Sequence, residues 1–290
     1  MSQKLQGYTY LTSAMILVGS TVIASKVIGG GLPPFTATAL RLAIALPFFI
    51  AIMRMSGASW PRPGTHDWVL LIFQSAAGSV GYTTLLITGL QLTSAANAGV
   101  IIGTLPVVSA SIAILILGER PRPSVLFAIA LGAAGVFAIV FQPQEAGTWS
   151  LFGNMLIFAA VLCEGLFILL NKRLSVPVAP LAQSTLMTGI GLAVALVPAL
   201  FEMPWTGSMA AASLWAVVYY ALVSTVGGYL LWYGGLARVS GSEASLFTAM
   251  APVSAVLLAF AVLGETVSLY QMIGIGCVLM AVLSLGFTRK

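Results

Sequence analysis

The chain holds few groups that could do chemistry, and the first of them is an isolated carboxylate. Glu164 lies in the apolar stretch Ala160-Val161-Leu162-Cys163-Glu164. A carboxylate in such a segment is costly and usually faces a cavity. There it could bind an amino group or gain and lose a proton. The alternative is a glutamate whose oxygens are satisfied by a neighbouring helix.

A set of aromatic and polar side chains near paired glycines is the second candidate. Aromatic rings could stack on a flat apolar ligand, and the polar members could add hydrogen bonds. We predict that these residues line a binding cavity, while the alternative for the Tyr and Trp side chains is an interfacial belt. The set comprises Phe167, which is one helical turn from Glu164, together with Tyr82, Tyr229, Gln74, Ser79 and Trp232.

Four further polar residues lie near predicted helix ends. Lys26 and Arg41 are expected near the outer mouth, where they either reach the lipid headgroups or attract a carboxylate of a ligand. Asn97 and Glu243 lie near the starts of two helices, and the ligand contact or gating contact that we predict there competes with ordinary helix-start roles.

Two prolines, Pro106 and Pro252, are predicted to lie inside helices. Proline removes a backbone donor and clashes with the carbonyl four residues earlier, so it kinks a helix. We expect both kinks to shape a cavity and to bend a gate. Metal and cofactor sites are not expected, because the one histidine, His66, is in a loop and the two cysteines are in apolar runs.

The composition determines what kind of framework must position these residues. Only 7% of the 290 residues are charged and 59% are hydrophobic, with a mean hydropathy of +1.05. A soluble domain carries about 25% charged residues, so the composition excludes a soluble globule and indicates a membrane protein. The net charge of +5 then reflects cytoplasmic loops, and no nucleic-acid partner is expected.

Ten apolar segments are each long enough to cross a bilayer as a helix, which needs roughly 20 residues. They are too long and too uniformly apolar for barrel strands. The predicted fold class is therefore an all-α membrane protein with ten transmembrane helices. The segments are 8–27, 35–54, 68–89, 94–117, 123–141, 151–170, 180–201, 213–234, 242–263 and 267–287.

The distribution of Lys and Arg predicts the orientation. With the N-terminus inside, ten of the twelve cationic residues fall on the inner side, and the exceptions are Lys26 and Arg41. Cytoplasmic loops carry the excess of positive charge, so both termini are predicted to be cytoplasmic.

The chain repeats itself after 146 residues. Pro34 then aligns with Pro180, Pro106 with Pro252, and Glu119 with Glu265; between 89–119 and 235–265 there are ten identities in 31 positions. We predict two five-helix units, 1–145 and 146–290. An odd number of helices inverts the second unit relative to the first, which is a common transporter design with a binding site near the midplane.

Two units that each carry Pro-Val and end the same helix with Leu-Gly-Glu resemble the EamA units of the drug/metabolite transporter superfamily. The chain looks most like the YddG-type exporters of aromatic amino acids. The surroundings of Glu164, with Lys172 eight residues later, also resemble the first helix of small multidrug transporters. That resemblance implies a role for Glu164 in binding substrate and protons.

The resemblance implies an inner-membrane secondary transporter that exports amphipathic metabolites, most of all aromatic and other neutral amino acids, by alternating access. We expect a monomer in the lipid bilayer, with a small molecule as substrate, no cofactor and no enzymatic activity. One alternative is an exporter of cationic drugs or another metabolite. A channel-like pore is the alternative from another class. No phosphate-binding loop for an ATPase is present in the sequence.

Overall fold

The computed structural model describes residues 3–117, 123–140, 150–175, 178–206, 209–239, 244, 247–248 and 250–287, and every regular element in these ranges is helical. In chain order the elements are α1 (Gln3–Gly29), α2 (Pro34–Met55), α3 (Thr65–Ser75), η1 (Ala76–Gly81), α4 (Tyr82–Leu92), α5 (Ala95–Gly103), α6 (Leu105–Leu117), α7 (Pro123–Val140), α8 (Leu151–Lys172), α9 (Pro180–Phe201), η2 (Pro204–Thr206), α10 (Ala211–Tyr219), η3 (Tyr220–Gly227), α11 (Gly228–Leu236), α13 (Met250–Leu263) and α14 (Leu269–Phe287).

Six helical stretches in the described part of the chain are long and apolar enough to cross a membrane. A seventh crossing results if the bent pair α5 and α6 forms one span. Three shorter apolar helices lie within α7, α13 and α14. The six long stretches are Gln3–Gly29, Pro34–Met55, Thr65–Leu92, Leu151–Asn171, Pro180–Phe201 and Ala211–Leu236.

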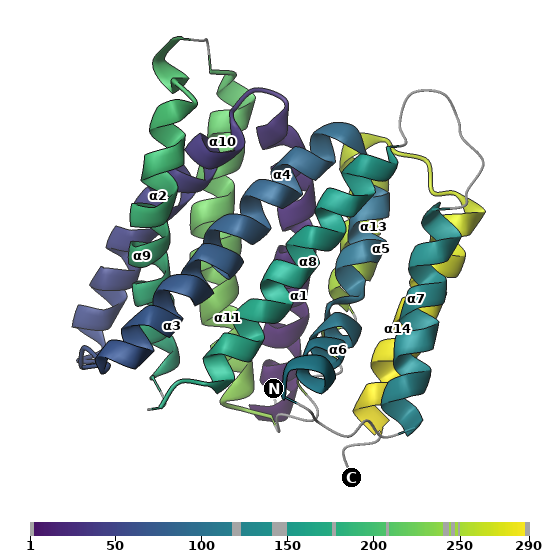
Figure 1. Cartoon of the computed structure of the whole chain (residues 1–290), viewed down its shortest axis with the longest axis horizontal. Coiled ribbons are helices and arrows are strands. Elements are labelled where there is room, and N and C mark those ends of the chain that lie inside the picture. Colours follow the sequence, from purple (N-terminus) through teal and green to yellow (C-terminus); the bar gives the residue numbers. More distant parts are fainter. Residues whose placement is uncertain are drawn as a thin grey trace.

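The helices form a bundle in which α1 lies in the interior (Figure 1). Helix α1 packs mainly against α13 and α11, while α2 packs along α9 at one edge and α7 along α14 at the other. The largest cluster of buried apolar residues lies where α4, α5, α8 and α13 meet. α1 begins on the same side as the α8–α9 connection, and the α1–α2 connection is on the opposite side (Figure 1).

Proline and glycine mark several helix boundaries. Pro34 and Pro180 are the first residues of α2 and α9, a position where the missing N–H costs no helical hydrogen bond. Gly57 follows α2 with φ of +65°, and Gly264 follows α13 with φ of +67°. Such φ values favour glycine because it lacks a Cβ atom.

Two stretches predicted as simple spans each contain a π-helical segment. η1 joins α3 to α4, and η3 joins α10 to α11, so that each stretch is continuous but locally widened. The segments end at Gly81 and Gly227, which are 146 residues apart. The same offset relates the first residues of α2 and α9 and those of α7 and α14. Helical elements therefore recur at the spacing of the sequence repeat.

The segment predicted as one span over 94–117 is broken instead. α5 ends at Gly103 and α6 begins at Leu105, and their axes differ by 42°. Pro106 lies in the first turn of α6, directly after the break. Pro252 is the third residue of α13, so it lies in the first turn of that helix and not inside it. In both places the proline lies where its missing N–H removes little from the helix.

Candidate functional site

A cavity of about 370 Å³ lies in the half of the bundle near the α8–α9 connection. Its walls come from α2, η1, α4, α8, α9, η3 and α11. Asn171 and Pro180, at the ends of α8 and α9, are exposed, so the cavity reaches that surface of the protein. The lining residues are Arg41, Leu42, Phe49, Gly78, Ser79, Tyr82, Thr83, Glu164, Phe167, Asn171, Pro180, Gln183, Ser184, Met187, Thr188, Tyr220, Thr225, Tyr229 and Tyr233.

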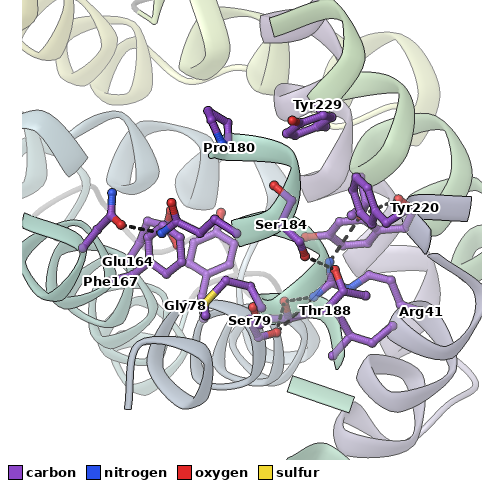
Figure 2. Close-up of a pocket in the computed structure, with 18 of the residues that line it drawn as sticks. Arg41, Gly78, Ser79, Glu164, Phe167, Pro180, Ser184, Thr188, Tyr220 and Tyr229 are labelled. Carbon is purple, nitrogen blue, oxygen red and sulfur yellow. Dashed lines mark hydrogen bonds between the residues drawn. The ribbon is translucent and has the colours of Figure 1, made fainter. Parts of the chain in front are cut away.

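Glu164 lines this cavity from α8, as the sequence predicted for a carboxylate in an apolar helix. None of the described residues forms a hydrogen bond with its carboxylate. The charges of Glu164 and Arg41 interact electrostatically across the cavity. Figure 2 shows Glu164 and Phe167 on one side and Arg41 and Tyr220 on the other. A carboxylate without a hydrogen bond to the described residues in such a place is available to a ligand cation.

Arg41 is buried in the cavity wall and not at the outer mouth, where the sequence placed it. Its Nη2 donates to the carbonyl oxygen of Ser79 at 3.0 Å and to Oγ1 of Thr83 at 3.1 Å, and its Nη1 donates to Oγ1 of Thr225 at 3.3 Å. The guanidinium also lies over the ring of Tyr220, 4.9 Å from its centroid. These partners are inside the bundle, so the account in which Arg41 reaches for lipid headgroups is wrong.

Aromatic residues form the part of the wall nearest to the open side. The ring of Tyr229 meets Phe49 edge-on at 5.4 Å between centroids and lies 4.6 Å from the ring of Tyr233. Tyr82 and Phe167 line the cavity as well. Such a cluster favours a flat apolar group, because aromatic pairs gain from edge contacts beyond the area that they bury. The sequence analysis named Tyr82, Tyr229 and Phe167 as lining residues but missed Phe49.

One face of α9 contributes a polar wall that the sequence analysis did not identify. Gln183, Ser184 and Thr188 recur at helical spacing on that face and all line the cavity. The Nε2 atom of Gln183 donates to Oδ1 of Asn171 on α8. Thr188 Oγ1 donates to the Ser184 carbonyl at 2.7 Å, while the Ser184 hydroxyl has no hydrogen bond to any described residue. Two polar residues four apart in an apolar helix, Ser184 and Thr188, were the signal that could have revealed this face.

Three residues that were predicted to bind substrate lie elsewhere. Gln74 is fully buried, and its Nε2 donates to the Phe167 carbonyl oxygen at 3.2 Å, so it supports the wall from behind. Trp232 is partly buried in α11 and is not among the lining residues. Asn97 is buried in α5, where its Oδ1 accepts from Nε2 of Gln271 at 2.8 Å. The structure therefore gives Asn97 a packing role away from the cavity.

Lys26 forms hydrogen bonds with the backbone at the turn between α4 and α5. Its Nζ donates to the carbonyl oxygens of Leu90 at 2.5 Å and Thr93 at 2.7 Å, which belong to the end of α4. Glu265 accepts from the backbone N–H groups of Ala95 and Ala96 at 2.9 Å, at the start of α5. A cation at a helix C-terminus and an anion at an N-terminus are both stabilising. Glu243, predicted as a gating residue, lies outside the described residues.

A closing layer separates the cavity from the α1–α2 side. We use this name for the apolar cluster of Ala39, Val80, Ala195 and Ala199, all of which are buried. Beyond it, the Glu202 carboxylate at the end of α9 accepts from the N–H groups of Phe35 at 2.9 Å and Thr36 at 2.6 Å. In the described residues, apolar packing and a charged contact therefore lie between the cavity and the α1–α2 side.

The chemistry that this arrangement permits is binding, by a carboxylate, a guanidinium and an aromatic wall. Among the described residues no group of three or more His, Cys, Asp or Glu side chains could hold a metal ion. The site has the composition of a small-molecule pocket, in which a few polar groups fix the orientation of a ligand between apolar walls.

Comparisons with known proteins agree with this architecture. The EamA-like transporter family matches residues 5–141 and 151–287, two copies that cover most of the chain. The uncharacterised transporter YetK of Bacillus subtilis (strain 168) is 33% identical over 284 residues, which are 96% of this chain and 86% of that protein. Protein PagO of Salmonella typhimurium is 24% identical over 261 residues, 88% of this chain and 84% of that protein.

A crystal structure with 22% sequence identity superposes with a TM-score of 0.64, covers 98% of this chain and 96% of the other, and shows the same fold. The spacing of the two matched segments, 5–141 and 151–287, is the 146 residues of the sequence repeat. The chain is a multi-pass membrane protein and belongs to the EamA-like transporter family.

Proposed function

We propose that this transporter exports aromatic and other neutral amino acids across the inner membrane, as the YddG-type exporters do. The observation that carries the proposal is the Glu164 carboxylate, which faces the cavity without a hydrogen bond to any described residue. A buried charge is expensive unless it is paired. A substrate ammonium group supplies the missing partner.

The remaining walls suit the rest of an amino acid. Arg41 lies across the cavity from Glu164 (Figure 2) and can attract the substrate carboxylate. The rings of Tyr229 and Phe49 also line the cavity and can contact the apolar side chain of the substrate. A volume of about 370 Å³ is at the lower end of the range for small-molecule sites, roughly 300–1,000 Å³. The site is therefore large enough for a single amino acid and too small for a large conjugate.

The repeat supports transport by alternating access. We infer ten crossings in two inverted five-helix units, 1–145 and 146–290, from six long apolar stretches, one bent pair and three shorter apolar helices in the described residues. Both units contribute to the cavity, α2 and η1 from the first and α8, α9 and η3 from the second. A chain with both units contains the whole transport path, so a monomer suffices.

Charge and access support the orientation that the proposed export requires. Lys4, Arg54, Arg173 and Arg238 belong to helix ends on the side where α1 begins, and the cavity reaches that side. Positive residues favour the cytoplasm. The charge distribution thus supports a cytoplasmic N-terminus and a cavity open to the cytoplasm, which is the state in which the proposed exporter would load its substrate.

A second substrate class, cationic amphipathic compounds, is favoured by the same carboxylate. Such a compound would use Glu164 and the aromatic wall but would not need Arg41. The two classes differ in the substrate carboxylate, so competition by phenylalanine and by its decarboxylated analogue phenethylamine separates them. Strong competition by phenethylamine alone indicates the cationic class.

The test is flux of labelled phenylalanine, tryptophan, threonine and a cationic dye into proteoliposomes, with and without a pH gradient. We expect saturable aromatic flux that unlabelled substrate competes, and Glu164→Gln should abolish it or its pH-driven part. The control variant is Glu265→Gln, which alters a carboxylate that caps the start of α5, outside the cavity. Flux that does not saturate indicates a pore, and dye flux without amino-acid flux contradicts the amino-acid proposal.

A further inference from the structure

We propose that Arg41 is a positioning residue that braces the two π-helical segments and so holds the transporter closed on the α1–α2 side. The inference goes beyond the proposed function because it does not depend on the substrate. It concerns the step that exposes the cavity to the other side of the membrane.

We call the Arg41 guanidinium, together with its acceptors in η1 and η3, the brace. Nη2 of Arg41 donates to the carbonyl oxygen of Ser79 in η1, and Nη1 donates to Oγ1 of Thr225 in η3. Ser79 and Thr225 are 146 residues apart, so they occupy equivalent positions in the two repeats. One side chain therefore joins equivalent points of both repeats across the cavity.

The π-helical geometry supplies these acceptors. A π turn shifts the hydrogen-bonding register by one residue, and such segments are frequent at functional sites. In η1 the Ser79 carbonyl accepts from the Thr83 hydroxyl as well as from Arg41. In η3 the Thr225 hydroxyl donates to the carbonyl of Tyr220, five residues earlier, and is thereby held toward Arg41.

The brace and the closing layer are neighbours in the chain. Ser79 is followed directly by Val80, which packs against Ala195 and Ala199 of α9 in the closing layer. Ala39, also in that layer, is two residues before Arg41 on α2. Movement of η1 away from Arg41 would withdraw Val80 from α9 at the same time. Opening on the α1–α2 side thus requires the brace to break.

The hydrogen bonds of Arg41 favour two distinct states, one in which the brace is formed and one in which it is broken. Arg41 is 7% exposed, and its Nε–H has no partner in the described structure. A buried cation depends on its remaining hydrogen bonds, each worth more than a bond between neutral groups. Removing the Thr225 acceptor should therefore shift the balance between closed and open states toward the open state.

The test measures access to the closing layer and not transport. In a background with Cys163→Ser and Cys277→Ser, Ala195→Cys places a thiol at a position that is 0% exposed when the layer is closed. Thr225→Val removes the brace acceptor while keeping the shape of the side chain, and Thr225→Ser restores the hydroxyl. Thr185→Val is the matched control, because that buried hydroxyl bonds only the Leu181 carbonyl of its own helix.

We expect the rate at which a charged thiol reagent labels position 195 to rise about tenfold in Thr225→Val, to return in Thr225→Ser and to stay unchanged in Thr185→Val. Arg41→Lys should also raise the rate, because a point charge cannot span both segments. Thermal unfolding in detergent identifies any variant that fails to fold.

Equal labelling rates at position 195 in Thr225→Val and Thr185→Val would overturn the proposal that Arg41 holds the closing layer shut. If Arg41 serves only as a ligand of the substrate carboxylate, Thr225→Val alters the half-saturation concentration without altering labelling. Because labelling requires no substrate, failure of the brace and failure of the amino-acid proposal give different results.

Discussion

Gly78 is the position where a single added methyl group tests the geometry of the cavity most directly. A Cβ atom there would lie 2.4 Å from Cδ2 and 2.8 Å from Cβ of Phe167. Ordinary contact begins near 3.4 Å, so the nearest ring atom must move by 3.4 − 2.4, or about 1 Å. The ring lines the cavity, and its movement reduces the space for substrate.

The magnitude follows from the overlap. Overpacking of a well-packed site typically costs about 1–3 kcal/mol. We expect Gly78→Ala to lower the midpoint of thermal unfolding in detergent. If the substrate complex carries about 1.4 kcal/mol of this strain, the half-saturation concentration for flux rises about tenfold.

The matched control is Gly228→Ala, at the start of α11, where an added Cβ meets nothing within 4 Å. That variant should unfold and transport as the wild type does. Phe167→Ala removes two of the three atoms that crowd position 78, so the double variant should recover part of the lost stability. If Gly78→Ala and Gly228→Ala behave alike in both assays, the packing of Phe167 against η1 is refuted.

Three other changes have outcomes that the structure determines. Glu265→Gln replaces the charged cap of α5, and the midpoint of thermal unfolding should fall by the equivalent of about 1 kcal/mol; an unchanged midpoint argues against the cap. Lys26→Met leaves the carbonyls at the end of α4 without their donor, and hydrogen–deuterium exchange measured by mass spectrometry should accelerate in the α4–α5 turn and not in α2. Tyr229→Phe keeps the ring contacts with Phe49 and should retain flux, whereas Tyr229→Leu should raise the half-saturation concentration in the same proteoliposome assay; equal effects would show that the ring contributes nothing.

The framework was predictable because its causes are local. Apolar length, proline at helix starts and the 146-residue repeat are properties of the sequence, and α2, α8 and α9 begin within one residue of the predicted spans. The bend between α5 and α6 agrees with the kink predicted at Pro106. The interruption of the helix at Thr104 was not predicted, because apolar composition continues through it without a change. The two π-helical segments were not predicted either, because a shift of one residue in the hydrogen-bonding register does not change the amino-acid composition.

The sequence indicated the candidate site only through charged residues, which are uncommon in apolar helices. Glu164 stands out because a carboxylate in an apolar helix has few explanations. Arg41 stood out equally but was placed wrongly, because its distance from the start of α2 shows depth and not which neighbours surround it. The polar face of α9 was missed since Ser and Thr can satisfy their hydroxyls on their own helix, as Thr188 does.

The asymmetry between the repeats connects these findings. Position 187, the equivalent of Arg41, is Met and also lines the cavity, while position 18, the equivalent of Glu164, is Val. Position 56, the equivalent of Glu202, is Ser, and its hydroxyl bonds the Met53 carbonyl of its own helix. The backbone elements recur while the charges that bind, brace and close occur in one copy each. A repeat can supply two backbone arrangements of similar energy, and unequal side chains then determine which of them the protein occupies without a ligand. Since the proposed brace and the Glu202 contact would both act on the α1–α2 side, they favour the state that is open at the α8–α9 connection. Under the proposed function, that is the state in which substrate is loaded.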